Sequence, residues 1–292
     1  MRNRFISVMS AWMFLFSLTG IAHAQGDKDK FKERYEGNSA NIPFSPHDFT
    51  GIWTMTKLDH TMGTPAPSLT PEGLKAMKGR VGDTPGVPQA IVAAAKGSAV
   101  VHLADANNAS NAPWLQCNPM GFPRLLNDDE PMELVTLNNR VLQFFQWEHT
   151  FREMWMDGRE VPSGQNLEKL GPAWYGHTAG KWEGDTLVLN TVGLDERAWL
   201  DNLGYPKSFQ ARIEERYRRV DSNTLELQLT LFDPKFYSSP WVSDKKVFKR
   251  IPEKDMTFSG WYGLYAGITE GACAPLNEVE GYEKGFHEPA SK

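Results

Sequence analysis

Polar side chains capable of acid and base chemistry stand within otherwise aromatic segments in the second half of the chain. These residues are Glu148, His149, Arg152, Tyr175, His177, Asp201 and Glu214. Histidine is the side chain best suited to proton transfer near neutral pH, and a carboxylate can orient its ring. We therefore take His177 as the first candidate acid or base, with Asp201 or Glu214 as its acidic partner.

A second histidine and an arginine extend this candidate catalytic set. Arg152 can hold a carboxylate or a developing oxyanion, and His149 would lie in a neighbouring strand. Two other interpretations stay open: His177 can satisfy a backbone carbonyl, or it can ligate a metal together with His149. The metal interpretation needs a third ligand that the spacing does not supply. We predict neither a metal nor another cofactor.

Common catalytic and nucleotide-binding signatures are absent from the sequence. It contains no Gly-x-Ser-x-Gly, Gly-x-Gly-x-x-Gly, Walker loop, His-Glu-x-x-His or Cys-x-x-Cys. This argues against a common hydrolase, a nucleotide-dependent enzyme and a zinc protease. The sequence is also compatible with a pocket for a flat apolar molecule, because aromatic residues stand in segments near His177 and Asp201. The predicted ligand-binding residues are Trp174, Tyr175, Trp199, Asn190 and Arg216.

The elements that must position these residues are short β runs separated by turn residues. With a first strand at 49–55, they cover 132–137, 140–147, 150–156, 175–182, 185–193, 211–220, 224–232 and 241–250. Tight turns force antiparallel neighbours, and closing the sheet removes its two exposed edges. We predict a mainly β fold, an antiparallel meander closed into a lipocalin-like barrel of about eight or nine strands.

Two turns determine which side chains share a face. A turn at 183–184 would place Asn190 opposite His177. A turn at 222–223 would place Glu214 and Arg216 on the same face as the leucines of 225–231. If that face points inward, the barrel holds a buried ion pair or a wet, ligand-holding interior. A β-bulge that shifts the register would instead leave these charges on the surface.

The region before the strands is helical and irregular. Thr70 and Pro71 are typical of a helix start, Gly79 ends that helix, and a second helix is expected over 88–96. The segment 98–129 is irregular and long for a simple connection, so we interpret it as a lid. We predict one barrel domain over 49–292 with a helical and loop insertion at about 68–130.

The first residues have the pattern of an export signal. Two arginines precede an apolar stretch over 6–21, and Ala22-His23-Ala24 follows. We expect a signal peptide over 1–24, cleavage after Ala24, a flexible leader over 25–48, and a periplasmic or secreted protein without a membrane span. In such a compartment Cys117 and Cys273 would form a disulfide; free thiols or a catalytic thiolate are the alternatives.

The charge balance limits the partners. The net charge is −5, and no basic patch is evident, so nucleic acid is not an expected partner. We expect a small-molecule ligand or substrate instead.

Three stretches together resemble a large family of secreted bacterial proteins of unassigned function. They are HTFREMWMDGRE, GHTAGKWEGDTLVLNTVGLDERAWLDNLGYP and IEERYRRVDSNTLELQLTLFDPKFYSSPW. Family members typically read GHS-GRWEGDTLVVDT, TWLD, ERFRR-D-DTL and DPK-Y-KPW. The resemblance covers about 114–273 and implies a fold and a compartment but no activity. Gly51-Ile52-Trp53 is also similar to the first-strand signature of lipocalins.

The chain departs from the family pattern in one loop. Where relatives often have Gly-His-Pro-His-Ser, residues 204–208 read Gly-Tyr-Pro-Lys-Ser. A mechanism or metal site that depends on those two histidines is therefore not expected here.

Three functions stay open on the sequence. The first is a cofactor-independent hydrolase, lyase or isomerase that uses His177 and an acidic partner. The second is a lipocalin-like carrier that leaves its ligand unchanged. The third is a structural or assembly module with a buried polar network.

Overall fold

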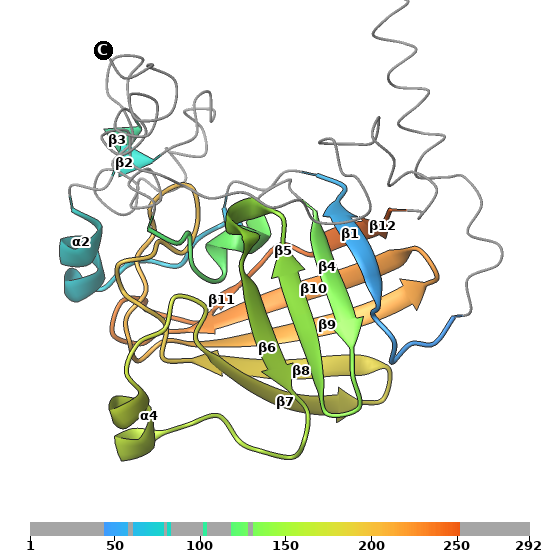
Figure 1. Cartoon of the computed structure of the whole chain (residues 1–292). Coiled ribbons are helices and arrows are strands. Elements are labelled where there is room, and N and C mark those ends of the chain that lie inside the picture. The colour runs from blue at the N-terminus through green and yellow to red at the C-terminus, as the bar shows by residue number, and fades with distance from the viewer. Residues whose placement is uncertain are drawn as a thin grey trace, which may run out of the picture.

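The computed structural model describes residues 44–57, 61–78, 118–127 and 131–251, together with the backbone of two short strands (Figure 1). The strands are β1 (Gly51–Met55), β2 (Val81–Gly82), β3 (His102–Leu103), β4 (Met132–Thr136), β5 (Arg140–Phe145), β6 (Phe151–Trp155), β7 (His177–Glu183), β8 (Thr186–Val192), β9 (Arg212–Asp221), β10 (Thr224–Phe232), β11 (Trp241–Val242) and β12 (Lys246–Arg250). The helices are α2 (Pro71–Met77) and α4 (Gly164–Leu170), with 3-10 turns η3 (Arg124–Asn127) and η4 (Trp147–His149).

Nine of these strands close into a barrel. Hydrogen-bonded neighbours run β10, β12, β1, β4, β5, β6, β7, β8 and β9, and β9 pairs again with β10. β1 connects the first strands of the chain with the last one in the barrel wall, because it pairs with β4 on one side and with β12 on the other. The predicted mainly β barrel of about eight or nine strands is thus confirmed.

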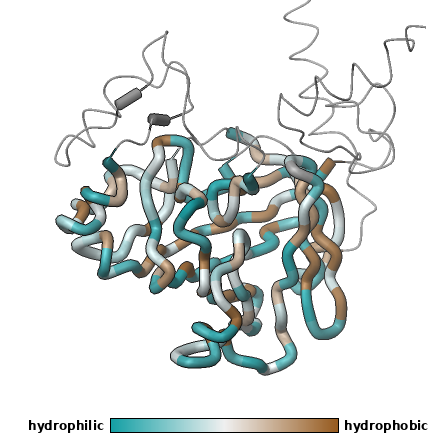
Figure 2. Tube along the Cα trace, turned by 60° about the vertical axis from the view of Figure 1, so that its left-hand side comes forward, coloured by the Kyte–Doolittle hydropathy of each residue, from teal (hydrophilic) through white to brown (hydrophobic). Residues whose placement is uncertain are grey.

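Alternating burial explains why these segments form a barrel wall. Along β5, buried residues alternate with half-buried ones, and along β9 the buried positions are Ile213, Glu215, Tyr217 and Arg219. This period of two places one set of side chains inside the barrel and the other outside. Short apolar and polar stretches accordingly alternate along the Cα trace in Figure 2.

One pairing in the barrel is parallel. β6 pairs with β7 through only two residue pairs, Met154 with Thr178 and Trp155 with Ala179. The connection between them is not a tight turn: it runs over 156–176 and contains α4. A parallel neighbour requires such a long connection, which is why the simple antiparallel meander fails at this seam.

The β9–β10 hairpin does not have the register that a simple two-residue turn at 222–223 would give. Thr224 pairs with Asp221, but a bulge follows, so that Leu229 lies opposite Glu215 rather than Arg216. The bulge shifts the register by one residue and exchanges the faces of β9. The inward placement of Glu214 and Arg216 is therefore wrong, and the alternative with a bulge is confirmed.

The barrel interior is filled with side chains. Trp53, Leu134, Met154 and Tyr217 are fully buried, as are the leucines of β10. Residues 121–127, part of the predicted lid, are also buried, and the Phe122 ring lies 3.9 Å from the guanidinium carbon of Arg152. This part of the predicted lid is packed against the barrel.

Of the features predicted before the barrel strands, the helix that begins after Thr70 lies in the described residues. The helix at Thr70 is confirmed: Thr70 caps α2 by accepting a hydrogen bond from the Gly73 amide at 3.1 Å. The signal peptide, the helix over 88–96, Cys117 and Cys273 lie outside the described residues. Within the described ranges, no helix is long and apolar enough to cross a membrane.

Candidate functional site

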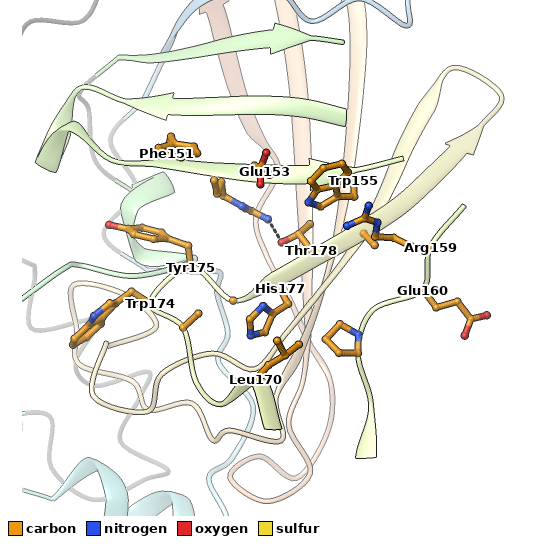
Figure 3. A pocket seen from close by; sticks show the side chains of 15 residues that line it. Phe151, Glu153, Trp155, Arg159, Glu160, Leu170, Trp174, Tyr175, His177 and Thr178 are labelled. Atoms are coloured by element: carbon orange, nitrogen blue, oxygen red, sulfur yellow. Dashed lines mark hydrogen bonds between the residues drawn. The ribbon is translucent and has the colours of Figure 1, made fainter. Parts of the chain in front are cut away.

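A cleft of about 510 Å³ lies at the seam between β6 and β7. Three segments line it: β6, the 156–176 connection and the first residues of β7 (Figure 3). Its lining residues are Phe151, Arg152, Glu153, Trp155, Arg159, Glu160, Pro162, Leu170, Ala173, Trp174, Tyr175, Gly176, His177, Thr178 and Ala179. Four residues predicted from the sequence meet here: Arg152, Trp174, Tyr175 and His177.

The sheet topology explains why a cleft forms at this place. Because β6 and β7 share only two residue pairs, the residues before them on each strand are free to diverge. Gly176 enters β7 with a φ of 68°, and a Cβ there would lie 2.8 Å from the carbonyl oxygen of Val192. Only glycine fits this left-handed, crowded position without strain. It brings Trp174 and Tyr175 to the start of β7.

Aromatic rings form much of the cleft wall. Phe151 and Leu170, which are 55% and 60% exposed, add apolar surface to the cleft. The guanidinium carbon of Arg159 lies 3.7 Å from the centre of the Trp155 ring, and that of Arg197 lies 4.5 Å from the centre of the Trp174 ring. These cation–π contacts hold two indoles in place at the cleft.

Two charged residues of the cleft, Arg159 and Glu153, are each paired with a neighbouring side chain outside the lining. Asp157 accepts hydrogen bonds from Arg159, the shortest at 2.6 Å, and this contact holds the pKa of the Asp157 carboxyl below its usual value. Glu153 forms an ion pair with Arg140 at 3.2 Å. The cleft is consequently an aromatic surface with a compensated charged rim.

His177 lies half-buried among the cleft residues. Its Nε2 lies 3.2 Å from the carbonyl oxygen of Gly171, just after α4. Across the sheet it faces Val192, so the predicted position of Asn190 opposite His177 is wrong. The β7–β8 turn lies at 184–185, one residue later than expected, because Gly184 supplies the positive φ of 57°. Asn190 instead faces Ala179 and accepts a hydrogen bond from Arg212.

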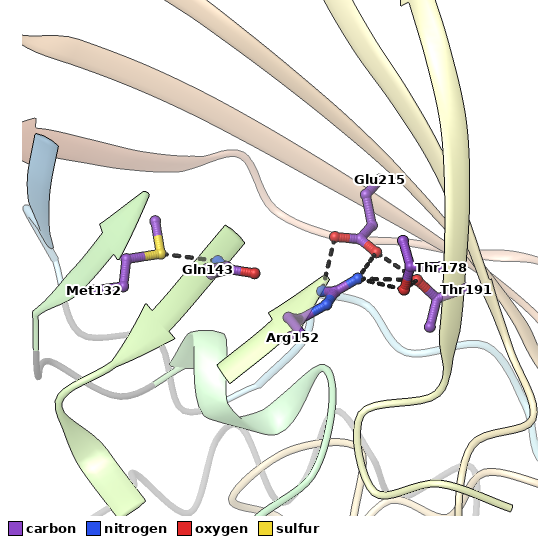
Figure 4. A network of polar contacts seen from close by, with 6 residues as sticks. All are labelled: Met132, Gln143, Arg152, Thr178, Thr191 and Glu215. Carbon is purple, nitrogen blue, oxygen red and sulfur yellow. Dashed lines mark hydrogen bonds and ion pairs between the residues drawn. The ribbon is translucent and has the colours of Figure 1, made fainter. Parts of the chain in front are cut away.

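Arg152 points into the barrel interior and forms a buried network (Figure 4). Its Nη2 donates to Glu215 Oε1 at 2.6 Å and to Thr178 Oγ1 at 2.8 Å, and Nη1 donates to Glu215 Oε2 at 3.1 Å. Thr191 donates to the same carboxylate at 2.6 Å. The side chains of Arg152 and Glu215 are 3% and 0% exposed, so this is a desolvated, bidentate ion pair.

Asp201 belongs to a different part of the molecule. Its carboxylate is fully buried and accepts hydrogen bonds from the backbone amides of Leu203 at 3.0 Å, Tyr205 at 3.3 Å and Met62 at 3.4 Å. Burial raises the pKa of Asp201 to about 6, although these hydrogen bonds act in the opposite direction. Asp201 organises the loop around it and does not line the cleft.

The remaining predicted site residues also lie away from the cleft. Glu214 and Arg216 contact each other at 3.5 Å, and Arg216 also pairs with Glu183 at 3.1 Å. Trp199 is buried, with the guanidinium of Arg124 5.3 Å from its ring centre. His149 is exposed in η4, with a φ of 50°. The structure therefore brings neither Asp201 nor Glu214 to His177.

Some residues of the site carried a weaker signal in the sequence. Phe151 and Trp155 alternate along β6, which could have indicated an aromatic outer face. Glu215 lies on the same face of β9 as Tyr217, and the bulge aligns that face with the buried leucines of β10, so the pairing of Glu215 with Arg152 depends on a local irregularity.

No group of three histidine, cysteine, aspartate or glutamate side chains is placed to hold a metal ion in the described part of the chain. Scans of protein-family models and of curated proteins gave no match to this chain. The likeness to a secreted bacterial family accordingly rests on the sequence motifs quoted above, and the closed barrel is compatible with a lipocalin-like fold.

Proposed function

We propose that this protein binds a small aromatic or partly apolar molecule in the cleft at the β6–β7 seam. The observation that carries the proposal is the lining: five residues with ring side chains, Phe151, Trp155, Trp174, Tyr175 and His177, line one cleft of about 510 Å³. Ligand sites are usually concave, apolar and aromatic, with a few polar groups that fix orientation. Planar ligands gain most there, because rings stack favourably on rings.

The geometry supports binding without turnover. The two acidic partners proposed for His177 are engaged elsewhere, Asp201 by backbone amides and Glu214 by arginines. Arg152 is already held by Glu215. The described hydrogen-bond partner of the His177 ring is a backbone carbonyl and not a carboxylate, so the described residues form no histidine–carboxylate pair of the kind used in acid–base catalysis.

The proposal places this binding outside the cytoplasm, since the first 24 residues have the pattern of a cleavable signal. Mass spectrometry of protein expressed with its full sequence in a bacterial host tests this part. A mature chain that begins at Gln25 is expected in the periplasm or medium. Full-length protein retained in the cytoplasm would overturn it.

A titration with ring compounds tests the binding site. Indole and 2-naphthol are added to ¹⁵N-labelled protein, and saturable shifts give the dissociation constants. Trp155→Ala should weaken binding about tenfold, because loss of a stacked ring costs about 1.4 kcal/mol. Phe44→Ala is the matched control, since Phe44 is 49% exposed and does not line the cleft. Equal weakening by both variants, or no saturable binding by wild type, would contradict the proposal.

A further inference from the structure

The His177 ring is fixed in the cleft by two neighbours on the same edge. Its Nε2 contacts the Gly171 carbonyl oxygen at 3.2 Å. Gly193 packs against the adjacent ring carbon: a Cβ built on Gly193 would lie 2.9 Å from His177 Cδ2 and 2.8 Å from Leu167 Cδ1. Gly193 also has a φ of 68°, so a glycine is needed both for the backbone and for the ring.

The Gly171 carbonyl determines which ring nitrogen carries the proton. A carbonyl oxygen can only accept a hydrogen bond, so the Nε2 that contacts it must be the N–H donor. In a neutral imidazole the other nitrogen then has no proton and is an acceptor. The structure thus assigns the Nε2–H tautomer to His177, with Nδ1 as a lone-pair acceptor.

Nδ1 is left for a ligand. The Cδ2–Nε2 edge faces Gly193 and Gly171, and Nδ1 lies on the other side of the ring. Among the residues that the structure describes, His177 makes no further hydrogen bond. Figure 3 shows its ring in the middle of the cleft residues, between Thr178 and Leu170. A half-buried acceptor of this kind gains a partner when a donor enters the cleft.

The other acceptors at the cleft compete less well. The Glu153 carboxylate is ion-paired to Arg140, and the Glu160 side chain is exposed to water. A hydrogen bond to an exposed carboxylate replaces one to water and gives little selectivity. The partly desolvated Nδ1 of His177, in the neutral form of the ring, is therefore the group that can accept a hydrogen bond from a donor on an apolar ring.

We propose that His177 Nδ1 makes the cleft selective for aromatic molecules that carry an N–H or O–H donor on the ring, such as indoles and phenols. This inference rests on the proposed function, because it names the ligand class of the same cleft. The preference should be about threefold to tenfold, the usual net effect of one hydrogen bond.

The test compares two isomeric probes, 3-methylindole and 1-methylindole. They have the same size and methyl count, but only 3-methylindole retains the ring N–H. Wild-type protein should bind 3-methylindole about fivefold more tightly. His177→Phe should remove that preference and His177→Asn should restore part of it, because the Asn oxygen can accept near the Nδ1 position. Glu183→Gln is the control and should keep the full preference, because Glu183 does not line the cleft.

The outcomes separate the inference from the proposed function. Equal binding of both probes by wild type would overturn the selectivity of His177 while leaving the cleft as a ring-binding site. Binding of neither probe would overturn both. The tautomer of His177 can also be measured without a ligand or a variant, from the ¹⁵N spectrum of its neutral imidazole ring. In that spectrum Nε2 should appear as the protonated nitrogen. A protonated Nδ1 in the neutral ring would contradict the inference even if His177→Phe failed to fold.

Discussion

The barrel interior and the cleft are adjacent, yet their polar side chains differ in how completely they are hydrogen-bonded. Inside, Arg152 and Glu215 are desolvated and bonded to each other and to two threonines. In the cleft, His177 uses one nitrogen for a backbone carbonyl and leaves the other free. The difference teaches that the interior network contributes to the fold, whereas the cleft has acceptor capacity left for a ligand.

The largest expected effect comes from breaking the interior ion pair. Arg152→Met should lower the free energy of unfolding by about 3–5 kcal/mol, because it leaves the Glu215 carboxylate buried without a partner. The double variant Arg152→Met with Glu215→Leu should recover most of that loss. Urea denaturation measures all three proteins. A single variant as stable as wild type would remove the distinction between interior and cleft.

Asp201 gives the next effect, and it concerns stability rather than ligand binding. Its pKa is raised from 3.8 to about 6 in the folded protein, so the protonated carboxyl stabilises the fold. That contribution is complete below about pH 4 and is lost as the pH rises through about 6. Between pH 4 and pH 7 the stability of wild type relative to Asp201→Asn should fall by on the order of 3 kcal/mol.

Denaturation of both proteins across this pH range is the measurement. Probe affinity in the cleft should be the same for both, since Asp201 does not line it. If the free energy of unfolding changes with pH in the same way for wild type and Asp201→Asn, burial does not raise the Asp201 pKa.

Gly193 affects both the stability of the fold and the position of the His177 ring in the cleft. Gly193→Ala should cost about 1–2 kcal/mol for a residue with positive φ, and it should also displace the His177 ring. The preference for 3-methylindole over 1-methylindole is then expected to fall toward one. Gly158→Ala is the matched control: its φ is 86°, and nothing lies within 4 Å of an added Cβ. If both variants keep the preference, Gly193 does not position His177.

The smallest effect is expected at the outer surface. Arg216 and Glu183 form an ion pair at 3.1 Å, but their side chains are 43% and 44% exposed. Glu183→Gln should therefore change stability by less than about 1 kcal/mol in urea denaturation. A loss comparable with that of Arg152→Met would mean that burial does not separate the two ion pairs.

The sequence predicts the strands well because burial on one face imposes a period of two, and closure was predicted because it removes the two exposed edges of an open sheet. Register is harder. The bulge after Thr224 and the turn at 184–185 are local backbone features, yet each moves an entire strand relative to its neighbour. That is why Arg152 was identified as a polar site residue while its partner Glu215 was not.

The cleft was predicted in part. Trp174, Tyr175 and His177 are close in sequence, so their proximity in space required little knowledge of the fold. Phe151 and Trp155 reach the same cleft through the parallel β6–β7 pairing, which depends on the long connection and on nothing local in either strand. Asp201 was proposed as the acidic partner of His177 because a carboxylate can orient a histidine ring, but the loop of Asp201 carries it elsewhere.

The most direct test of a ligand site in the cleft, outside the packed interior, uses the tryptophan indole signals. The full sequence has ten tryptophans, nine of them after residue 24, and each gives one side-chain ¹H–¹⁵N resonance that a Trp→Phe variant assigns. Addition of 3-methylindole should shift the signals of Trp155 and Trp174 and leave those of the buried Trp53 and Trp241 unchanged. Shifts at Trp53 with none at Trp155 would place the ligand inside the barrel and contradict the account.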